Sequence, residues 1–239
     1  MKNLLENLVK NLVRNNMRNN MKKNMKKSLL QGLVAGSGLV LALGFSINAF
    51  ADLGGNAQVA LEKAKKDILH FRIIENAKVY SGGRPEPQDL RTLKELGVKT
   101  VINLQGGDYD LFGDAAAYFE AGESYAVIRQ ERTTAINLKI GWYPFRLSTF
   151  APVGTAEQAD IKKILEILSD KTMQPVFFHC EFGQDRSGLI AALYEVFFLN
   201  ESVENAHARW VAFGHSGQLA QYATTGLDQY FYSATAHLH

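Results

Sequence analysis

Apolar residues recur along much of the chain at intervals of three or four positions, which is the spacing of one face of an α-helix. In the stretch 155–169, for example, one face carries Ile161, Ile164, Leu165 and Leu168, and Thr155 is placed to cap the start. Helices are predicted on this basis at 56–71, 88–96, 131–138, 155–169, 187–199, 203–213 and 217–232.

Short continuous apolar runs separate these helices and predict buried strands. The clearest are KTVINL at 99–104 and PVFFH at 175–179, and shorter candidates lie at 78–81 and 141–147. Because strands alternate with helices, the sequence predicts an α/β fold with a mostly parallel central sheet flanked by helices. Ligands of such sheets bind beyond the carboxyl ends of the strands.

The first 51 residues differ from the rest in charge and hydropathy. They contain eight basic residues and one acidic residue, an uncharged apolar stretch at 29–45, and the sequence Ala49-Phe50-Ala51. This order predicts a signal peptide over 1–51, and hence a periplasmic or secreted protein with a single domain over 52–239. The alternative is an uncleaved membrane anchor that faces outside the cytoplasm, although 17 residues with four glycines are marginal for a span.

Residues 52–239 carry 18 basic and 23 acidic side chains. This acidic balance disfavours nucleic acid or an anionic membrane surface as a partner. We therefore expect membrane contact only if the N-terminal segment is retained.

Cys180 is the only cysteine, so an exported form of the chain has no internal disulfide. The thiol is either a buried apolar filler or a reactive group. Its neighbours favour the second reading, because Cys180 lies in the segment HCEFGQDRSG, between an expected strand and an expected helix.

Five residues separate Cys180 from Arg186 in this segment. A loop of that length can curl until its backbone N–H groups converge on an anion, and the same positive field stabilises a thiolate. Arg186 can hold two phosphate oxygens through its planar guanidinium. Gly183 lets the loop turn, and Ser187 can donate a hydrogen bond to the sulfur. We expect His179 to brace the loop.

HCEFGQDRSG resembles the His-Cys-x5-Arg-Ser/Thr signature of the protein tyrosine and dual-specificity phosphatases. VYSGGRPEPQDLRTLKELGVKTVINLQGG is similar to the opening of the small atypical dual-specificity enzymes of bacteria and plants. ERTTAINLKIGWYPFRLSTFAP and ARWVAFGHSGQLAQYATTGLDQYF resemble later parts of the same enzymes, so the likeness covers roughly residues 72–231. It implies the cysteine-phosphatase (dual-specificity-like) fold.

The resemblance also implies hydrolysis of a phosphate ester through a phosphocysteine intermediate, with no metal or cofactor. Cys180 would attack phosphorus, and Arg186 with the loop amides would hold the oxygens. The expected substrate is a phosphorylated protein or a small phosphomonoester. The residues expected to bind it are Glu181, Phe182, Gly183, Gln184, Asp185 and Arg186.

One part of the family pattern is missing from the chain. Many relatives carry an aspartate general acid on a separate loop, but the matching segment 146–158 has no Asp, and its only carboxylate, Glu157, falls in an expected helix. Asp185 is the best substitute as the acid, and bracing of the loop is its alternative role. Further candidates are Asp108, Asp110 and Asp114.

The loop composition also bears on the ligand. Glu181 and Asp185 are acidic and no Lys is present between Cys180 and Arg186, which disfavours a multiply phosphorylated ligand and favours phosphotyrosine or another simple monoester.

A rhodanese-like sulfurtransferase and a non-catalytic phosphate-binding module are the alternative functions. Two histidines, His207 and His215, are expected at helix surfaces or caps rather than as metal ligands.

Overall fold

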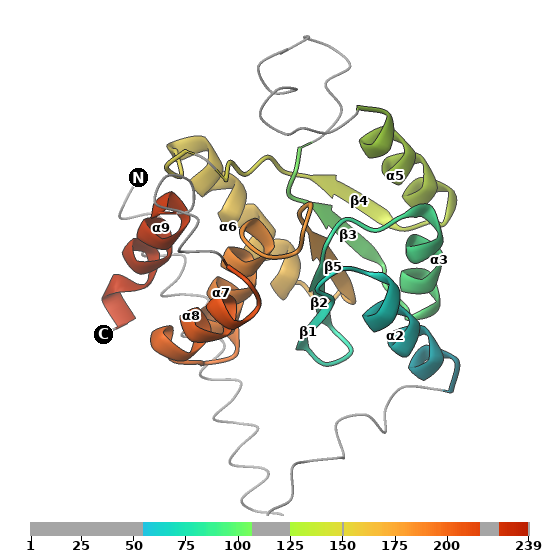
Figure 1. Cartoon of the computed structure of the whole chain (residues 1–239), viewed down its shortest axis with the longest axis horizontal. Helices are drawn as coiled ribbons and strands as arrows, with labels where there is room; N and C mark the ends of the chain where they lie inside the picture. The colour runs from blue at the N-terminus through green and yellow to red at the C-terminus, as the bar shows by residue number, and fades with distance from the viewer. Residues whose placement is uncertain (1–54, 107–124, 150, 216–224, 239) are drawn as a thin grey trace, which may run out of the picture.

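The computed structural model describes residues 55–106, 125–149, 151–215 and 225–238. Within these ranges one sheet has the strand order β1-β2-β5-β3-β4 (Figure 1). β1 is antiparallel to β2, and every other neighbouring pair is parallel, which confirms the predicted mostly parallel α/β sheet. The strands are β1 (Arg72–Glu75), β2 (Val79–Gly82), β3 (Thr100–Asn103), β4 (Gly141–Pro144) and β5 (Val176–His179).

Helices cover both faces of the sheet (Figure 1). One face carries α2 (Gly55–Asp67), α3 (Pro87–Glu95) and α5 (Tyr125–Asn137). The opposite face carries α6 (Thr155–Ser169), α7 (Arg186–Phe198), α8 (Val203–Ala212) and α9 (Thr225–Thr235), which leads into the short 3-10 helix η2 (Ala236–Leu238). In the described ranges, none of these helices combines the length and the apolar character that crossing a membrane would require.

The central strand β5 divides the core into two layers. Because successive side chains of a strand point to opposite faces, Phe177 packs in the cluster that includes Leu61, while Phe178 packs in the cluster that includes Ile164 and Leu189. Both phenyl rings are fully buried, and each burial stabilises the fold by about 2–3 kcal/mol. The strand that carries the loop with Cys180 is therefore fixed from both sides.

The element boundaries differ from the predicted ones in three informative places. The helix expected to reach residue 71 ends at Asp67, since His70 adopts a left-handed backbone (φ 48°), and the unpredicted edge strand β1 follows. β4 ends at Pro144 rather than at 147. The cap of α6 is Gly154 rather than Thr155, because the Glu157 carboxylate accepts the Gly154 N–H (2.9 Å).

Candidate active site

The loop of residues 180–185 joins β5 to α7 at the carboxyl end of the sheet. β5 lies between β2 and β3, so neighbouring strands support this loop on both sides. Cys180 belongs to the apolar cluster against α7 and is 3% exposed. Its Sγ lies 3.3 Å from Ser187 Oγ in the first turn of α7, so the fold brings this predicted pair into contact.

The carbonyl groups of the loop are turned outward, because each one from Glu181 to Asp185 accepts a hydrogen bond from a group outside the loop. The donors are Arg84 N to Glu181 O (3.0 Å), His70 Nδ1 to Phe182 O (2.7 Å), Arg72 Nη2 to Gly183 O (2.9 Å), Trp210 Nε1 to Gln184 O (3.1 Å) and Leu189 N to Asp185 O (2.9 Å).

Because the carbonyl groups of these peptide units point outward, their N–H groups point toward the inside of the loop. None of the backbone N–H groups from 181 to 186 donates to another residue in the described ranges. A concave set of unpaired N–H groups binds anions, and the N-terminus of α7 adds its positive dipole. The loop therefore has the form of an anion-binding nest.

Gly183 makes this loop shape possible. Its backbone is left-handed (φ 76°), and a Cβ on it would lie 2.5 Å from Gly83 N and 2.6 Å from the carbonyl carbon of Gly82. Any side chain would collide with the end of β2, so only glycine fits.

Arg186 is the first residue of α7 and is partly buried. Its guanidinium forms no hydrogen bond or ion pair with any residue that the structure describes. An arginine without a protein partner beside a nest of N–H groups is free to grip two oxygens of a bound phosphate.

A buried carboxylate on α5 contacts His179, the residue that precedes Cys180. Glu131 accepts hydrogen bonds from Trp142 Nε1 (2.7 Å) and Asn103 Nδ2 (3.2 Å), and it lies 3.0 Å from His179 Nε2. The other ring nitrogen of His179 lies 3.3 Å from the Cys180 carbonyl oxygen. Sequence reasoning missed Glu131, because nothing in its local pattern marks it as a partner of a residue 48 positions away.

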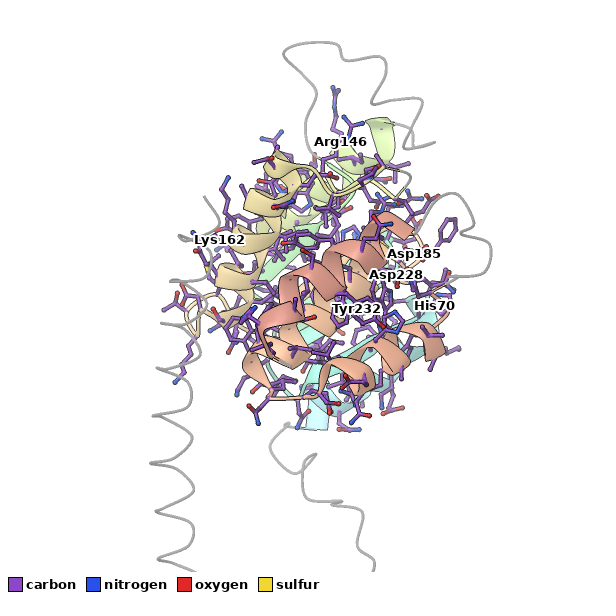
Figure 2. All side chains as sticks on the ribbon, turned by 90° about the vertical axis from the view of Figure 1, so that its left-hand side faces the viewer. His70, Arg146, Lys162, Asp185, Asp228 and Tyr232 are labelled. Atoms are coloured by element: carbon purple, nitrogen blue, oxygen red, sulfur yellow. The ribbon has the colours of Figure 1, made fainter. Side chains whose placement is uncertain are left out.

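A chain of acidic and histidine side chains leads away from Asp185. His215 Nδ1 lies 2.8 Å from Asp185 Oδ1, and His215 Nε2 lies 3.0 Å from Asp228 Oδ2. The second oxygen of Asp228 bonds His207 Nε2 (2.8 Å). In Figure 2, Asp185 and Asp228 lie close together on the face of α7–α9, with Tyr232 and His70 nearby, and Arg146 and Lys162 lie apart from them.

His215 is therefore not the surface or capping residue that the sequence led us to expect. Its side chain is 1% exposed and stacks on Trp210 with ring centroids 3.9 Å apart. Burial by itself disfavours the charged ring, but hydrogen bonds to Asp185 and Asp228 outweigh it and raise the pKa of His215 to about 9. Near neutral pH, Asp185 thus faces a buried imidazolium.

Comparison with known proteins identifies the family of the chain. A sequence profile of the tyrosine phosphatase family matches residues 50–196, which is more than half of the chain. The chain belongs to the tyrosine phosphatase family. The predicted resemblance to atypical cysteine phosphatases is confirmed. No curated protein sequence matches it.

Solved structures show that the phosphatase shares its fold with distant relatives. A DUF442 protein from Shewanella putrefaciens CN-32 is 17% identical, with a TM-score of 0.52 over 73% of this chain and 97% of that one. The core catalytic domain of the PP-IP phosphatase SIW14 from S. cerevisiae is 16% identical, with a TM-score of 0.50 over 69% and 84%. TpbA from P. aeruginosa also matches at 18% identity, but its TM-score of 0.47 over 69% and 84% is too low to support a shared fold. The predicted fold class is confirmed, and the domain bounds 52–239 stay a prediction.

The candidate acids of the phosphatase lie in different surroundings. Asp185 is in the loop, with Oδ1 bonded to His215 and no described partner for Oδ2. Glu157 is engaged elsewhere, since its carboxylate accepts the Ser148 N–H (2.5 Å) and the Gly154 N–H (2.9 Å) and closes the turn before α6. The other candidates, Asp108, Asp110 and Asp114, lie outside the described residues.

Two further loop side chains differ in their surroundings. Phe182 is 54% exposed. Gln184 turns its amide toward His70, with Nε2 3.3 Å from the ring Nε2, and its side chain occupies the space beside Gly214. Of the predicted substrate-binding residues, Phe182 thus offers an exposed ring, whereas the Gln184 amide is engaged by the protein.

Proposed function

We propose that this phosphatase hydrolyses phosphotyrosine or another simple phosphomonoester through a phosphocysteine intermediate. The observation that carries the proposal is the loop between Cys180 and Arg186, in which every carbonyl from Glu181 to Asp185 is held outward. The unpaired N–H groups, the Arg186 guanidinium and the buried sulfur all belong to this loop and the start of α7, which supports a site that stabilises the charge of a transferred phosphoryl group.

The proposed reaction has two steps. In the first, Cys180 Sγ forms a bond to phosphorus as the bond from phosphorus to the leaving oxygen breaks, and that oxygen takes a proton. Arg186 and the loop amides hold the three equatorial oxygens throughout. In the second step, water attacks phosphorus and gives a proton to the carboxylate that acted as the acid in the first step. The bond from sulfur to phosphorus breaks, so that inorganic phosphate is released and the sulfur leaves as a thiolate. Ser187 Oγ, 3.3 Å away, is placed to stabilise the charge on the departing sulfur.

We assign the proton donor to Asp185, with His215 as its partner. The Asp185 Oδ2 atom has no described partner, so a proton carried on Oδ2 can pass to the leaving oxygen, while Oδ1 stays hydrogen-bonded to His215. The same ion pair supports the competing role of Asp185, in which it only braces the loop. The two roles predict different dependence on the leaving group.

A simple monoester is favoured by the charges at the loop. Glu181 and Asp185 would repel further phosphate groups on a substrate, and no Lys lies between Cys180 and Arg186. The exposed ring of Phe182 supplies an apolar wall that suits an aromatic leaving group such as tyrosine. SIW14 acts on PP-IP according to its description, but a likeness of 16% identity carries only its fold to this chain.

Hydrolysis of p-nitrophenyl phosphate at mildly acidic pH tests the proposal. The wild type should turn it over, Cys180→Ser should not, and Arg186→Lys should lose roughly a hundredfold or more in kcat/KM because it cannot form the bidentate contact. Arg91→Lys, an exposed residue on α3, is the matched control and should behave like the wild type. A wild type that binds phosphate without turnover would instead be a binding module.

The acid assignment needs two leaving groups. Asp185→Asn should lower kcat for phenyl phosphate, a poor leaving group, by roughly a hundredfold or more, and should affect p-nitrophenyl phosphate much less. Equal losses for both esters would show that Asp185 only braces the loop.

We also propose that residues 1–51 direct export and are removed after Ala51. N-terminal sequencing of the exported protein should then begin at Asp52. A membrane-bound protein with an intact N-terminus would support the anchor instead.

A further inference from the structure

Arg72 on β1 is a buried cation beneath the loop. Its side chain comes from the edge strand, and the residue is 5% exposed. Its Nη2 donates to the Gly183 carbonyl (2.9 Å) and to Ser81 Oγ (3.3 Å), while its Nε has no partner. Charged side chains at this depth are costly unless an anion compensates them.

No carboxylate compensates Arg72 at short range in the described part of the chain. The carboxylate whose charge acts on it most is Glu195 on α7, and Glu195 is held by Arg209, whose Nε donates to it at 2.9 Å. The outer side of the Arg72 guanidinium is covered by the Phe213 ring, with 4.7 Å from its central carbon to the ring centroid. The protein thus keeps a positive charge under the loop without providing an acidic partner for it.

The other group whose negative charge acts on Arg72, when it is ionised, is the sulfur of Cys180. Burial lowers the pKa of Arg72 to about 10, and the charges of Cys180 and Glu195 act in the opposite direction. Arg72 therefore stays protonated near neutral pH. The other charged or titratable side chains of this segment are His179 at the end of β5, which contacts Glu131 on α5, Glu181 and Asp185 in the loop, and Arg186 at the start of α7.

We propose that Arg72 is a positioning residue of the phosphatase, whose buried charge holds Cys180 as a thiolate and whose hydrogen bond to Gly183 O keeps the loop amides turned toward the phosphate. This inference rests on the proposed function. In this proposal, the negative charge that compensates Arg72 is the Cys180 thiolate before the substrate binds. After the substrate binds, it is the phosphoryl group.

Alkylation of Cys180 by iodoacetamide tests the charge directly, because only the thiolate reacts and the chain has no other cysteine. The rate is measured from about pH 4 to about pH 9, with loss of the free thiol followed by mass spectrometry. Arg72→Met should slow alkylation about tenfold near pH 6, through an upward shift of the pH midpoint. Arg72→Lys keeps a charge and should stay within about threefold of the wild type.

Two controls accompany these variants. Arg91→Met removes an exposed arginine from α3 and should leave the pH midpoint unchanged, which excludes an effect of net charge. Phe213→Ala uncovers the Arg72 guanidinium but keeps the hydrogen bonds that it donates. Water should then screen the charge of Arg72, and alkylation should be about threefold slower than in the wild type. Phe213 is 40% exposed, so this variant tests the proposal even if Arg72→Met does not fold.

Two results would overturn the inference. One is an unchanged alkylation midpoint in folded Arg72→Met and Phe213→Ala, with folding checked by circular dichroism. The other is an Arg72→Lys variant that is slowed as much as Arg72→Met, because charge would then not be the cause. Alkylation needs no turnover, so a wild type inactive on phosphate esters would defeat the proposed function while this measurement still reported on Arg72.

Discussion

His215 carries a positive charge inside the protein, between two carboxylates. Asp185 bonds one ring nitrogen at 2.8 Å and Asp228 bonds the other at 3.0 Å. These contacts hold the pKa of His215 at about 9, whereas an ordinary histidine has 6.5. A histidine whose pKa is higher in the folded state binds its proton more tightly there, so protonation favours folding.

The difference between the pKa of His215 in the folded protein and the ordinary pKa of histidine predicts how stability depends on pH. The His215 contribution is fully present below about pH 6.5 and is lost as pH rises to about 9, so the free energy of unfolding should fall by roughly 3 kcal/mol over that window. Urea unfolding at a series of pH values measures the change. His215→Gln should remove most of it, while His237→Gln, at an exposed position, should keep it. A slope that persists in His215→Gln would contradict the ion pair.

The residues that sequence alone could reveal are those that lie close together in the chain. Cys180, Gly183, Arg186 and Ser187 stand within one short segment, where spacing between a strand and a helix exposes their chemistry. The residues that shape and charge this segment, such as Arg72 and Glu131, come from elements far away in sequence. No local pattern relates them to Cys180, because only the folded sheet places them beside it.

At the scale of elements, α7 and α8 meet through a glycine. A Cβ on Gly188 would lie 2.1 Å from both Cδ1 and Nε1 of Trp210, and Trp210 is itself 1% exposed. The indole Nε1 donates to the Gln184 carbonyl, so the packing of the two helices and the loop geometry depend on the same side chain. A rigid indole cannot give way here without loss of that hydrogen bond.

Gly188→Ala should therefore destabilise the protein by about 2 kcal/mol or more, through overpacking between α7 and α8. Because Trp210 must move, kcat/KM for p-nitrophenyl phosphate should fall as well. Gly55→Ala at the start of α2 is the matched control, since nothing lies within 4 Å of its added Cβ. Thermal unfolding of both variants gives the comparison, and equal melting temperatures would contradict the predicted collision.

Elements with strong periodic patterns were predictable from sequence, and short edge elements were not. α6 runs from Thr155 to Ser169 as predicted, because its apolar stripe is regular and Glu157 closes its first turn. β1 was missed, since its four residues RIIE follow the predicted helix without a turn signal and are too few to show a periodic pattern. α5 begins at Tyr125, six positions before the predicted start, in a stretch without clear periodicity.

At the scale of the whole molecule, binding at the loop is linked to global stability. A ligand that binds only the folded state stabilises it by about 2.7 kcal/mol at a hundred times its Kd. For a domain of this size that corresponds to a rise in Tm of roughly 6–10 °C. Inorganic phosphate should produce this rise in the wild type and in Cys180→Ser, but only at much higher concentration in Arg186→Lys. A rise no greater than that with sodium chloride of equal ionic strength would contradict the anion site.

The outward anchoring of the loop carbonyls has a consequence for how the anion site could be built or transplanted. His70, Arg72 and Arg84 flank the β1–β2 hairpin, Trp210 lies on α8, and Gly183 fits only against the end of β2. A synthetic decapeptide HCEFGQDRSG would carry the whole signature but none of these anchors. It should show no measurable affinity for phosphate. A graft of the ten residues into another strand–helix junction would also need a hairpin and an indole that donate to the loop carbonyls, because those anchors come from other elements of the fold.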